Sequence, residues 1–272
     1  MTNLEARLRR FARLWRYPVY EARNKTLGFV GALRNAYLQR SEIRRLQVAL
    51  AGSDWRGRVL VVIPTYRRPE GLQRALQSAL SQTFKDIVVV VVDDGGGDLP
   101  TINSDARVLV VSLSSNCGTL GVVRNIGVAL ARSEFIAYLD DDNIWTPNHL
   151  QAAVSALESS QALGVVYTSV QRLRPDGSEL DVLVEPFLRR KLGGKNFVDS
   201  NSIVVRRSCH VEFSKVPRNK TTVPKEDWEY IWRLSRNHRV KHIPEVTVRY
   251  LVNPDSYYTS WTPTQIGVEQ SE

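Results

Sequence analysis

Three consecutive carboxylates, Asp140, Asp141 and Asp142, directly follow an apolar run at residues 135–139 of this 272-residue sequence. Neighbouring carboxylates repel one another, so placing them where a buried strand ends is costly unless a cation or hydrogen bonds compensate. A divalent cation is the simplest compensation, because Mg²⁺ and Mn²⁺ are commonly held by one or two carboxylates together with substrate phosphates. The triplet therefore predicts metal-assisted chemistry on a phosphorylated substrate. The alternative is that these acids cap a helix beginning near Pro147.

A second acidic motif, Asp93-Asp94, lies between an apolar run at residues 87–92 and three glycines. Asp and Gly are common turn residues, so an ordinary turn is the alternative interpretation. At the end of a strand, a carboxylate can accept the imide N–H of a uracil or thymine ring, and glycines let the backbone approach a nucleoside closely. The motif therefore predicts a nucleoside site.

These motifs can meet only if the apolar runs before them are neighbouring strands of one sheet. Four runs are almost wholly apolar, as parallel strands covered on both faces are: residues 59–63, 87–92, 108–111 and 135–139. Between them, helical patterns predict helices at residues 69–81, 118–131 and 147–157. The alternation predicts an α/β fold with a Rossmann-like, mostly parallel sheet and helices on both faces. Ligands of such sheets bind beyond the carboxyl ends of the strands, where Pro64, Thr65 and Tyr66 follow the first run.

The second half of the sequence has a mixed pattern. It predicts strands at residues 165–170, 202–205 and 246–250, and a helix at residues 224–236. We therefore expect one domain over residues 56–255, followed by a tail at residues 256–272.

Composition excludes several classes of protein. Only two cysteines occur, so neither a disulfide framework nor a four-ligand zinc site is indicated, and a reducing cytosol fits best. No apolar run reaches the roughly 18 to 20 residues that span a bilayer, and the N-terminus lacks the apolar core of a signal peptide. We expect a cytoplasmic protein, soluble or peripheral on the inner face of the membrane.

The N-terminal segment, residues 1–55, is basic. Its first fifty residues hold roughly eight of the nine net positive charges. Apolar residues recur in it at helical spacing, interrupted at Pro18: Leu4, Leu8, Phe11, Leu14, Trp15, Leu27, Val30, Leu33 and Tyr37. This predicts an amphipathic helical appendage. Its stripe would serve inward packing or homo-oligomer contact, or an anionic membrane surface; nucleic acid is the weakest alternative, because the aromatic residues share the stripe with the leucines.

Successive motifs of the chain resemble glycosyltransferase family 2, which has the GT-A fold. They are VVIPTYRR at residues 61–68, SQTF at 81–84, VDDG at 92–95, Asn116-Cys117-Gly118 with Arg124-Asn125, and YLDDDNIWTP at 138–147. The segments QTFKD and DDNI especially resemble the spore-coat polysaccharide glycosyltransferases of that family. The resemblance covers residues 58–250 and leaves out the N-terminal segment.

The resemblance implies a site for a nucleoside-diphosphate sugar. Its residues would be Pro64, Thr65, Tyr66, Asp94, Gly118, Arg124, Asp140 and Asp141. Within it, Asp94 would read the base, and Asp142 would coordinate Mn²⁺ or Mg²⁺. Arg124 matches an Ala-Arg-Asn position of the family, although Val123 replaces the usual small residue. The alternative for Arg124 is a helix arginine paired with a nearby acid.

A later Glu-Asp motif, Glu226-Asp227, resembles the one that carries the catalytic base of inverting members. By this resemblance Asp227 is the base, and Glu226 the second choice. Desolvation beside Trp228 or Trp232 would raise the pKa of Asp227. The alternative is structural, because acids in the first turn of a helix interact favourably with its dipole.

The activity implied is inverting transfer of a sugar from a donor linked to UDP or dTDP onto a hydroxyl of a glycan or a lipid-linked acceptor. A catalytically inactive nucleotide-sugar or glycan binding protein on the same scaffold is the alternative. Neither a glycine-rich phosphate-binding loop nor a Gly-x-Ser-x-Gly elbow occurs, which disfavours a nucleotidyltransferase and a serine hydrolase.

Overall fold

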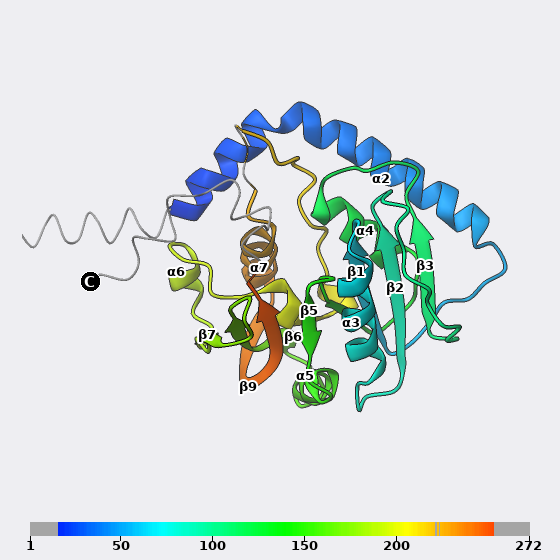
Figure 1. Cartoon of the computed structure of the whole chain (residues 1–272). Helices are drawn as coiled ribbons and strands as arrows, with labels where there is room; N and C mark the ends of the chain where they lie inside the picture. Colours follow the sequence, from blue (N-terminus) through cyan, green and yellow to red (C-terminus); the bar gives the residue numbers. More distant parts are fainter. Residues whose placement is uncertain (1–15, 221, 223, 253–272) are drawn as a thin grey trace, which may run out of the picture.

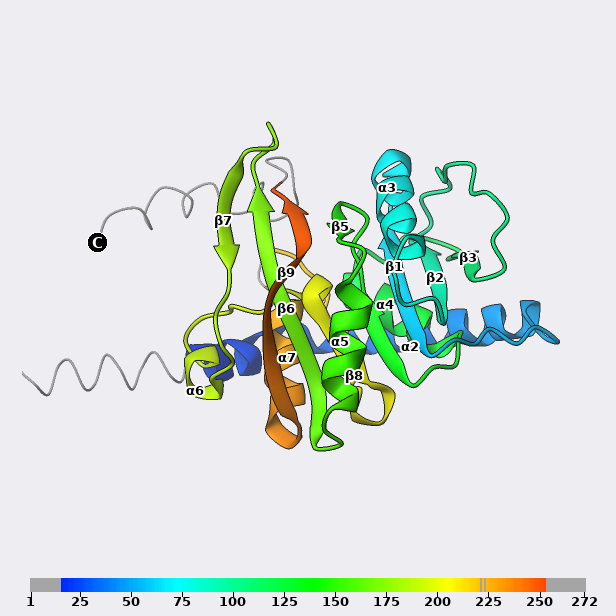
Figure 2. The same cartoon turned by 90° about the horizontal axis from the view of Figure 1, so that it is seen from below.

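The structure is a computed structural model that describes residues 16–220, 222 and 224–252. One sheet runs through it in the order β3-β2-β1-β4-β8-β6-β9-β5, and β7 pairs with β6 (Figures 1 and 2). The strands are β1 (Val59–Thr65), β2 (Ile87–Asp93), β3 (Val108–Ser112), β4 (Phe135–Tyr138), β5 (Asn143–Trp145), β6 (Leu163–Leu173), β7 (Glu179–Leu183), β8 (Ile203–Arg206) and β9 (Arg239–Leu251). The helices are α2 (Phe29–Ala49), α3 (Pro69–Leu80), α4 (Leu120–Ala129), α5 (His149–Glu158), α6 (Arg189–Leu192) and α7 (Glu226–Asn237), with short 3₁₀ turns η1 (Ser200–Ser202) and η2 (Arg207–Cys209).

The first half of the sheet is parallel. Strand β1 pairs in parallel with β2 and β4, and β2 pairs in parallel with β3. Every residue of β1, β2 and β4 is buried, which is the reason for their nearly continuous apolar sequences. The four strands predicted here are confirmed. Their shared direction brings the loops after β1, β2 and β4 to one edge of the sheet.

The second half mixes directions. Strand β8 runs antiparallel to both β4 and β6, whereas β6 and β9 are parallel. We predicted only the last part of β9, because Pro244 interrupts its sequence pattern. In the structure the strand continues through Pro244, which has no pairing partner in β6, and the β6–β9 register shifts between Thr168 and Ser169. Strands β5 and β7 were not predicted. Strand β5 is only three residues long, and no residue of β7 is fully buried, so its sequence has no regular apolar pattern.

Helices cover both faces of the sheet. The core on one face includes side chains of α4 and α7, and the core on the other includes those of α3 and α5. Figures 1 and 2 show α4 and α7 lying on the side toward α2, away from α5. The predicted α/β fold class with two covered faces is confirmed.

The N-terminal segment is helical where it is described. Residues 16–27 form a helix that contains Pro18, a turn follows at Gly28, and α2 then arches along the outside of the domain (Figure 1). The break expected at Pro18 thus falls at Gly28. A Cβ on Gly28 would lie 2.5 Å from Val216, so its bare backbone permits close contact with the 214–217 loop. Residues 4–15 of the predicted stripe, and the predicted tail, lie outside the described residues.

The rest of the stripe does not pack inward, and that alternative is wrong for it. Its members are 54–80% exposed: Leu27, Val30, Leu33 and Tyr37. Helix α2 buries Leu46 in the core, and beside it buries Asn35, Gln39 and Glu42, which bond to polar groups of the domain. The surface beneath α2 offers polar groups as well as the core, and together they select a mixed side of the helix that leaves the stripe exposed. Among the described helices, none combines the length and hydropathy needed to cross a membrane.

Candidate active site

A cavity of about 630 Å³ opens beyond the carboxyl ends of β1, β2 and β4. Every residue predicted for the site lines it: Pro64, Thr65, Tyr66, Asp94, Gly118, Arg124, Asp140, Asp141, Asp142 and Asp227. They come from the end of β1, from the loops that follow β1, β2, β3 and β4, from the middle of α4 and from the first turn of α7, up to 163 positions apart in sequence from Pro64 to Asp227. The structure therefore brings the whole predicted set together.

The end of β1 is tied to the acidic loop after β4. Thr65 Oγ1 donates to Asp141 Oδ2 at 2.8 Å, and Arg68 Nη1 lies 3.2 Å from Asp141 Oδ1. Burial raises the pKa of the Asp141 carboxyl to about 6, although the Thr65 hydrogen bond and the Arg68 charge oppose the rise. Asp141 is thus a buried link between two loops.

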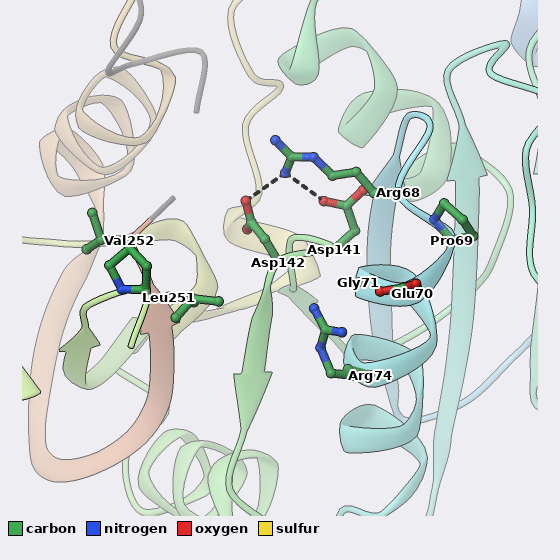
Figure 3. Close-up of a pocket in the computed structure, with 10 residues that line it drawn as sticks. Arg68, Pro69, Glu70, Gly71, Arg74, Asp141, Asp142, Leu251 and Val252 are labelled. Carbon is green, nitrogen blue, oxygen red and sulfur yellow. Dashed lines mark hydrogen bonds and ion pairs between the residues drawn. The ribbon is translucent and has the colours of Figure 1, made fainter. Parts of the chain in front are cut away.

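Arg68 also pairs with Asp142, a contact that the sequence did not predict. Its Nη1 lies 2.7 Å from Asp142 Oδ2, so one guanidinium bridges two of the three consecutive carboxylates (Figure 3). The same three residues line a second hollow of about 440 Å³, together with Glu70 and Arg74 of α3. Arg68 is therefore the cation that compensates this part of the acidic loop in the structure.

Asp142, the residue predicted to coordinate a divalent cation, lies where the two hollows meet. Its side chain is 29% exposed and faces both hollows. Asp142 bonds Arg68 and Asn143, and Asp140 bonds Arg124 and Asn201 but lines only the larger hollow. The described residues contain no group of three or more acidic, His or Cys side chains that could hold a metal. A hard cation at Asp142 would receive this one protein carboxylate and would need phosphates and water for its other ligands.

The end of β2 shapes the opposite wall of the cavity. Asp94 accepts hydrogen bonds from the backbone N–H groups of Cys117, at 2.8 Å, and Gly118, at 3.0 Å. Burial raises the pKa of the Asp94 carboxyl. Gly95 has a φ of 72°, and a Cβ there would lie 2.6 Å from the backbone of Ser115. Asp94 therefore holds the 116–118 loop, and each of its oxygens keeps a second lone pair for a ligand.

Arg124 connects the acidic loop with α7. Its side chain is only 1% exposed, and Nη2 donates to Asp140 Oδ1 at 2.6 Å and to Ser200 Oγ at 2.9 Å, while Nη1 donates to Asp227 Oδ1 at 3.2 Å. Burial disfavours its charge, but Asp140 and Asp227 raise the pKa of Arg124. The alternative interpretation of Arg124, an arginine paired with nearby acids, is therefore observed. Contact of Arg124 with a nucleotide-sugar donor stays a prediction.

Helix α7 begins with the acidic pair. Burial raises the pKa of Asp227, against the opposing charge of Arg124, and burial with the charge of Asp227 raises the pKa of Glu226 to about 7. The rise expected for Asp227 is thus confirmed in direction. Trp228 and Trp232 pack with Tyr17, at ring distances of 4.8 and 5.4 Å.

Two polar residues of η1 were missed from the sequence. Asn201 accepts the backbone N–H of Asp140 at 2.6 Å and donates to its Oδ2 at 3.0 Å, and Ser200 bonds Arg124. Nearby Asp199 lines the cavity, and burial raises its pKa to about 7. A polar run at residues 199–202 between apolar residues was the available signal.

Replacing Arg124 by Met is expected to destabilise the fold by about 3 kcal/mol, because it leaves Asp140 and Asp227 without their buried counter-charge. We place the loss at the low end of the range for broken buried pairs, since both carboxylates reach the cavity. Denaturant unfolding measures it. Arg74→Met, on the exposed side of α3, is the matched control and should stay within about 0.5 kcal/mol of the unmodified chain. Equal stability of the two variants would contradict the bridging role.

The comparisons with known proteins agree with this fold. The chain is 25% identical over 206 residues to the chondroitin synthase of Pasteurella multocida, covering 73% of this chain and 21% of that protein. It is 25% identical over 207 residues to the uncharacterised glycosyltransferase YwdF of Bacillus subtilis, covering 71% of this chain and 74% of that protein. The first relatives are matched over only 21–36% of their own length.

Solved structures show the same architecture. S. aureus TarS 1–349 in complex with UDP-GlcNAc matches with a TM-score of 0.56 at 17% identity, over 75% of this chain and 60% of that one. The mannosyltransferase PcManGT from Pyrobaculum calidifontis, in complex with GDP-Man and Mn²⁺, matches with a TM-score of 0.52 at 15% identity, over 87% and 71%. The sequence model of the family described as "Glycosyl transferase family 2" matches residues 60–207, more than half of the chain. This chain belongs to glycosyltransferase family 2.

Proposed function

We propose that this chain transfers a sugar from a UDP- or dTDP-linked donor to an acceptor hydroxyl, with divalent-cation assistance and inversion at the anomeric carbon. The observation that carries the proposal is the shared cavity: Asp94, Asp142 and Asp227 line one space of about 630 Å³. That volume lies within the usual range for small-molecule sites. TarS binds UDP-GlcNAc and PcManGT binds GDP-Man with Mn²⁺ on the same fold, which supports a nucleotide-sugar donor here.

The donor end of the cavity would hold the nucleoside and the diphosphate. Asp94 would accept the pyrimidine N3–H, and Pro64, Thr65 and Tyr66 would line the nucleoside at the end of β1. A cation held by Asp142 would neutralise the charge that grows on the departing diphosphate. Arg68, already paired with Asp142, adds positive charge at the same place.

The acceptor end would contain the base. Asp227 takes the proton of the attacking hydroxyl, and a raised pKa makes a carboxylate a better base near neutral pH. Arg124 orients Asp227 through its Oδ1. A single displacement, with the base on the face opposite the leaving group, inverts the anomeric centre.

The competing function is a nucleotide-sugar or glycan binding protein without activity. The presence of both Asp142 and Asp227 in one cavity favours the enzyme. Release of free nucleoside diphosphate from a donor separates the two functions, because a binding protein retains the donor unchanged.

The base preference is tested by the thermal stability of the chain with nucleoside diphosphates and Mn²⁺. We expect UDP and dTDP to raise Tm most, since a ligand at a hundredfold excess over its Kd stabilises the native state by about 2.7 kcal/mol. CDP is the matched control, because N3 of cytosine carries no hydrogen for Asp94 to accept. A larger shift with GDP, or equal shifts with UDP and CDP, would show the base assignment to be wrong.

A further inference from the structure

The outward face of the N-terminal helices is both apolar and basic. We call it the basic apolar face. Its exposed apolar residues are Val19, Leu27, Phe29, Val30, Leu33, Tyr37 and Val48. Its exposed arginines are Arg16, Arg23, Arg34, Arg40 and Arg44. Tyr17 and Leu46 of these helices are buried in the core, so the exposed apolar residues form a second apolar surface that the domain does not cover. An exposed apolar surface of this kind indicates an apolar partner.

No exposed acid balances these arginines within residues 16–50. The acids of that segment are Glu21 and Glu42, and both are buried. Glu21 pairs with Lys25, and Glu42 pairs with Arg45 and bonds Ser114. The basic apolar face therefore presents positive charge without a compensating carboxylate, which selects a negatively charged partner.

The inner side of α2 is firmly held, so the outward direction of the face is set by the domain. Asn35 Nδ2 donates to Thr119 Oγ1 at 3.0 Å and to the Lys215 carbonyl at 2.9 Å. Gln39 donates to Glu212 at 2.7 Å and accepts from Asn125 at 3.0 Å. Turning the apolar side inward would break these buried hydrogen bonds.

We propose that the basic apolar face docks on an anionic phospholipid bilayer. Val30, Leu33 and Tyr37, spaced three and four apart, would enter the interface, and the arginines would meet the lipid phosphates, as in helices that lie in the plane of a membrane. A second copy of the chain fits less well, because a two-fold contact would bring like-charged arginines together. Nucleic acid fits less well because aliphatic residues dominate the face.

Docking would place the active-site cavity close to the bilayer. Thr119, which bonds Asn35 of α2, lines that cavity, and so does Val216, which lies against Gly28. Figures 1 and 2 show α2 along the outside of the domain, beside α4. Acceptors attached to lipid would thus be presented near the site. That consequence rests on the proposed function, whereas the docking itself does not.

Flotation of the full chain with vesicles tests the docking without any donor. We expect recovery with vesicles of phosphatidylglycerol and phosphatidylcholine, little recovery with phosphatidylcholine alone, and loss of binding at high salt. The charge variant Arg34→Gln, Arg40→Gln, Arg44→Gln should partition about a hundredfold more weakly. The apolar variant Val30→Ser, Leu33→Ser, Tyr37→Ser should lose at least tenfold.

Control variants alter exposed residues outside the basic apolar face. Arg56→Gln, Arg132→Gln, Arg174→Gln removes the same charge, and Leu180→Ser, Val184→Ser, Leu188→Ser makes three apolar-to-serine changes at residues that are 36–51% exposed. Both controls should float like the unmodified chain. Equal recovery of the two test variants and the unmodified chain would overturn the proposal. So would a dimer, or a nucleic-acid complex, that depends on these residues while vesicles recover nothing.

Discussion

Asp227→Asn is expected to slow sugar transfer by about 10²- to 10⁴-fold, the usual cost of losing a general base. The amide cannot take the acceptor proton. Its carbonyl oxygen can still accept the hydrogen bond from Arg124, so the α7 end of the site should keep its arrangement. Donor affinity should stay close to that of the unmodified chain, because the residues proposed to hold the base and the cation, Asp94 and Asp142, are unchanged.

The structural alternative for Asp227 leads to a different measurement. Asp227 lies in the first turn of α7, where an acid interacts favourably with the helix dipole. If that were its whole role, the amide would cost a few tenths to about 1 kcal/mol of stability and leave transfer nearly intact. The acceptor product itself must be measured, since donor hydrolysis can persist without a base.

Glu226→Gln is the matched control, being the neighbouring acid in the same turn. We expect it to retain transfer. Near-normal transfer by Asp227→Asn together with an inactive Glu226→Gln would move the base to the neighbouring residue, and activity in both would refute the mechanism.

The pH dependence of transfer follows from the same carboxyl. A base works in its charged form, so transfer is present above the pKa of Asp227 and is lost as pH falls through it. Burial raises that pKa, and the loss should therefore begin above the usual aspartate range.

Asp142→Asn is expected to abolish turnover while the fold survives. The change removes the charge proposed to hold the cation. It removes little packing, because the side chain is partly exposed and bonds only Arg68 and Asn143. Arg68 retains Asp141 as a partner. Product formation and the Mn²⁺-dependent rise in Tm with UDP should both disappear.

Asp105→Asn is the matched control for Asp142→Asn. Asp105 pairs with Arg107 outside the cavity, so this variant also breaks an Asp–Arg pair but should keep its activity. Full activity of Asp142→Asn in the presence of a chelator would rule out the cation.

Local sequence determined the four strands β1 to β4 and the ten predicted residues that line the cavity. Apolar runs fix where β1, β2 and β4 lie, and the polar motifs follow these strands directly, so a parallel sheet must bring them to one edge. The family also follows from motifs that are each contiguous. Reasoning from neighbouring residues is sufficient for such features.

Tertiary structure decided which polar side chains pair through hydrogen bonds and ion pairs. Arg124 bridges residues from a loop and from α7, and Asn201 reaches Asp140 across 61 positions of sequence. The direction of α2 also depended on its surroundings: the stripe alone left inward packing, oligomer contact and a membrane surface open, and the hydrogen bonds of Asn35 and Gln39 with the domain, beside buried Leu46, leave the stripe outward. Helical spacing gives the angle between two faces of a helix, whereas the groups on the opposing surface decide which face is buried.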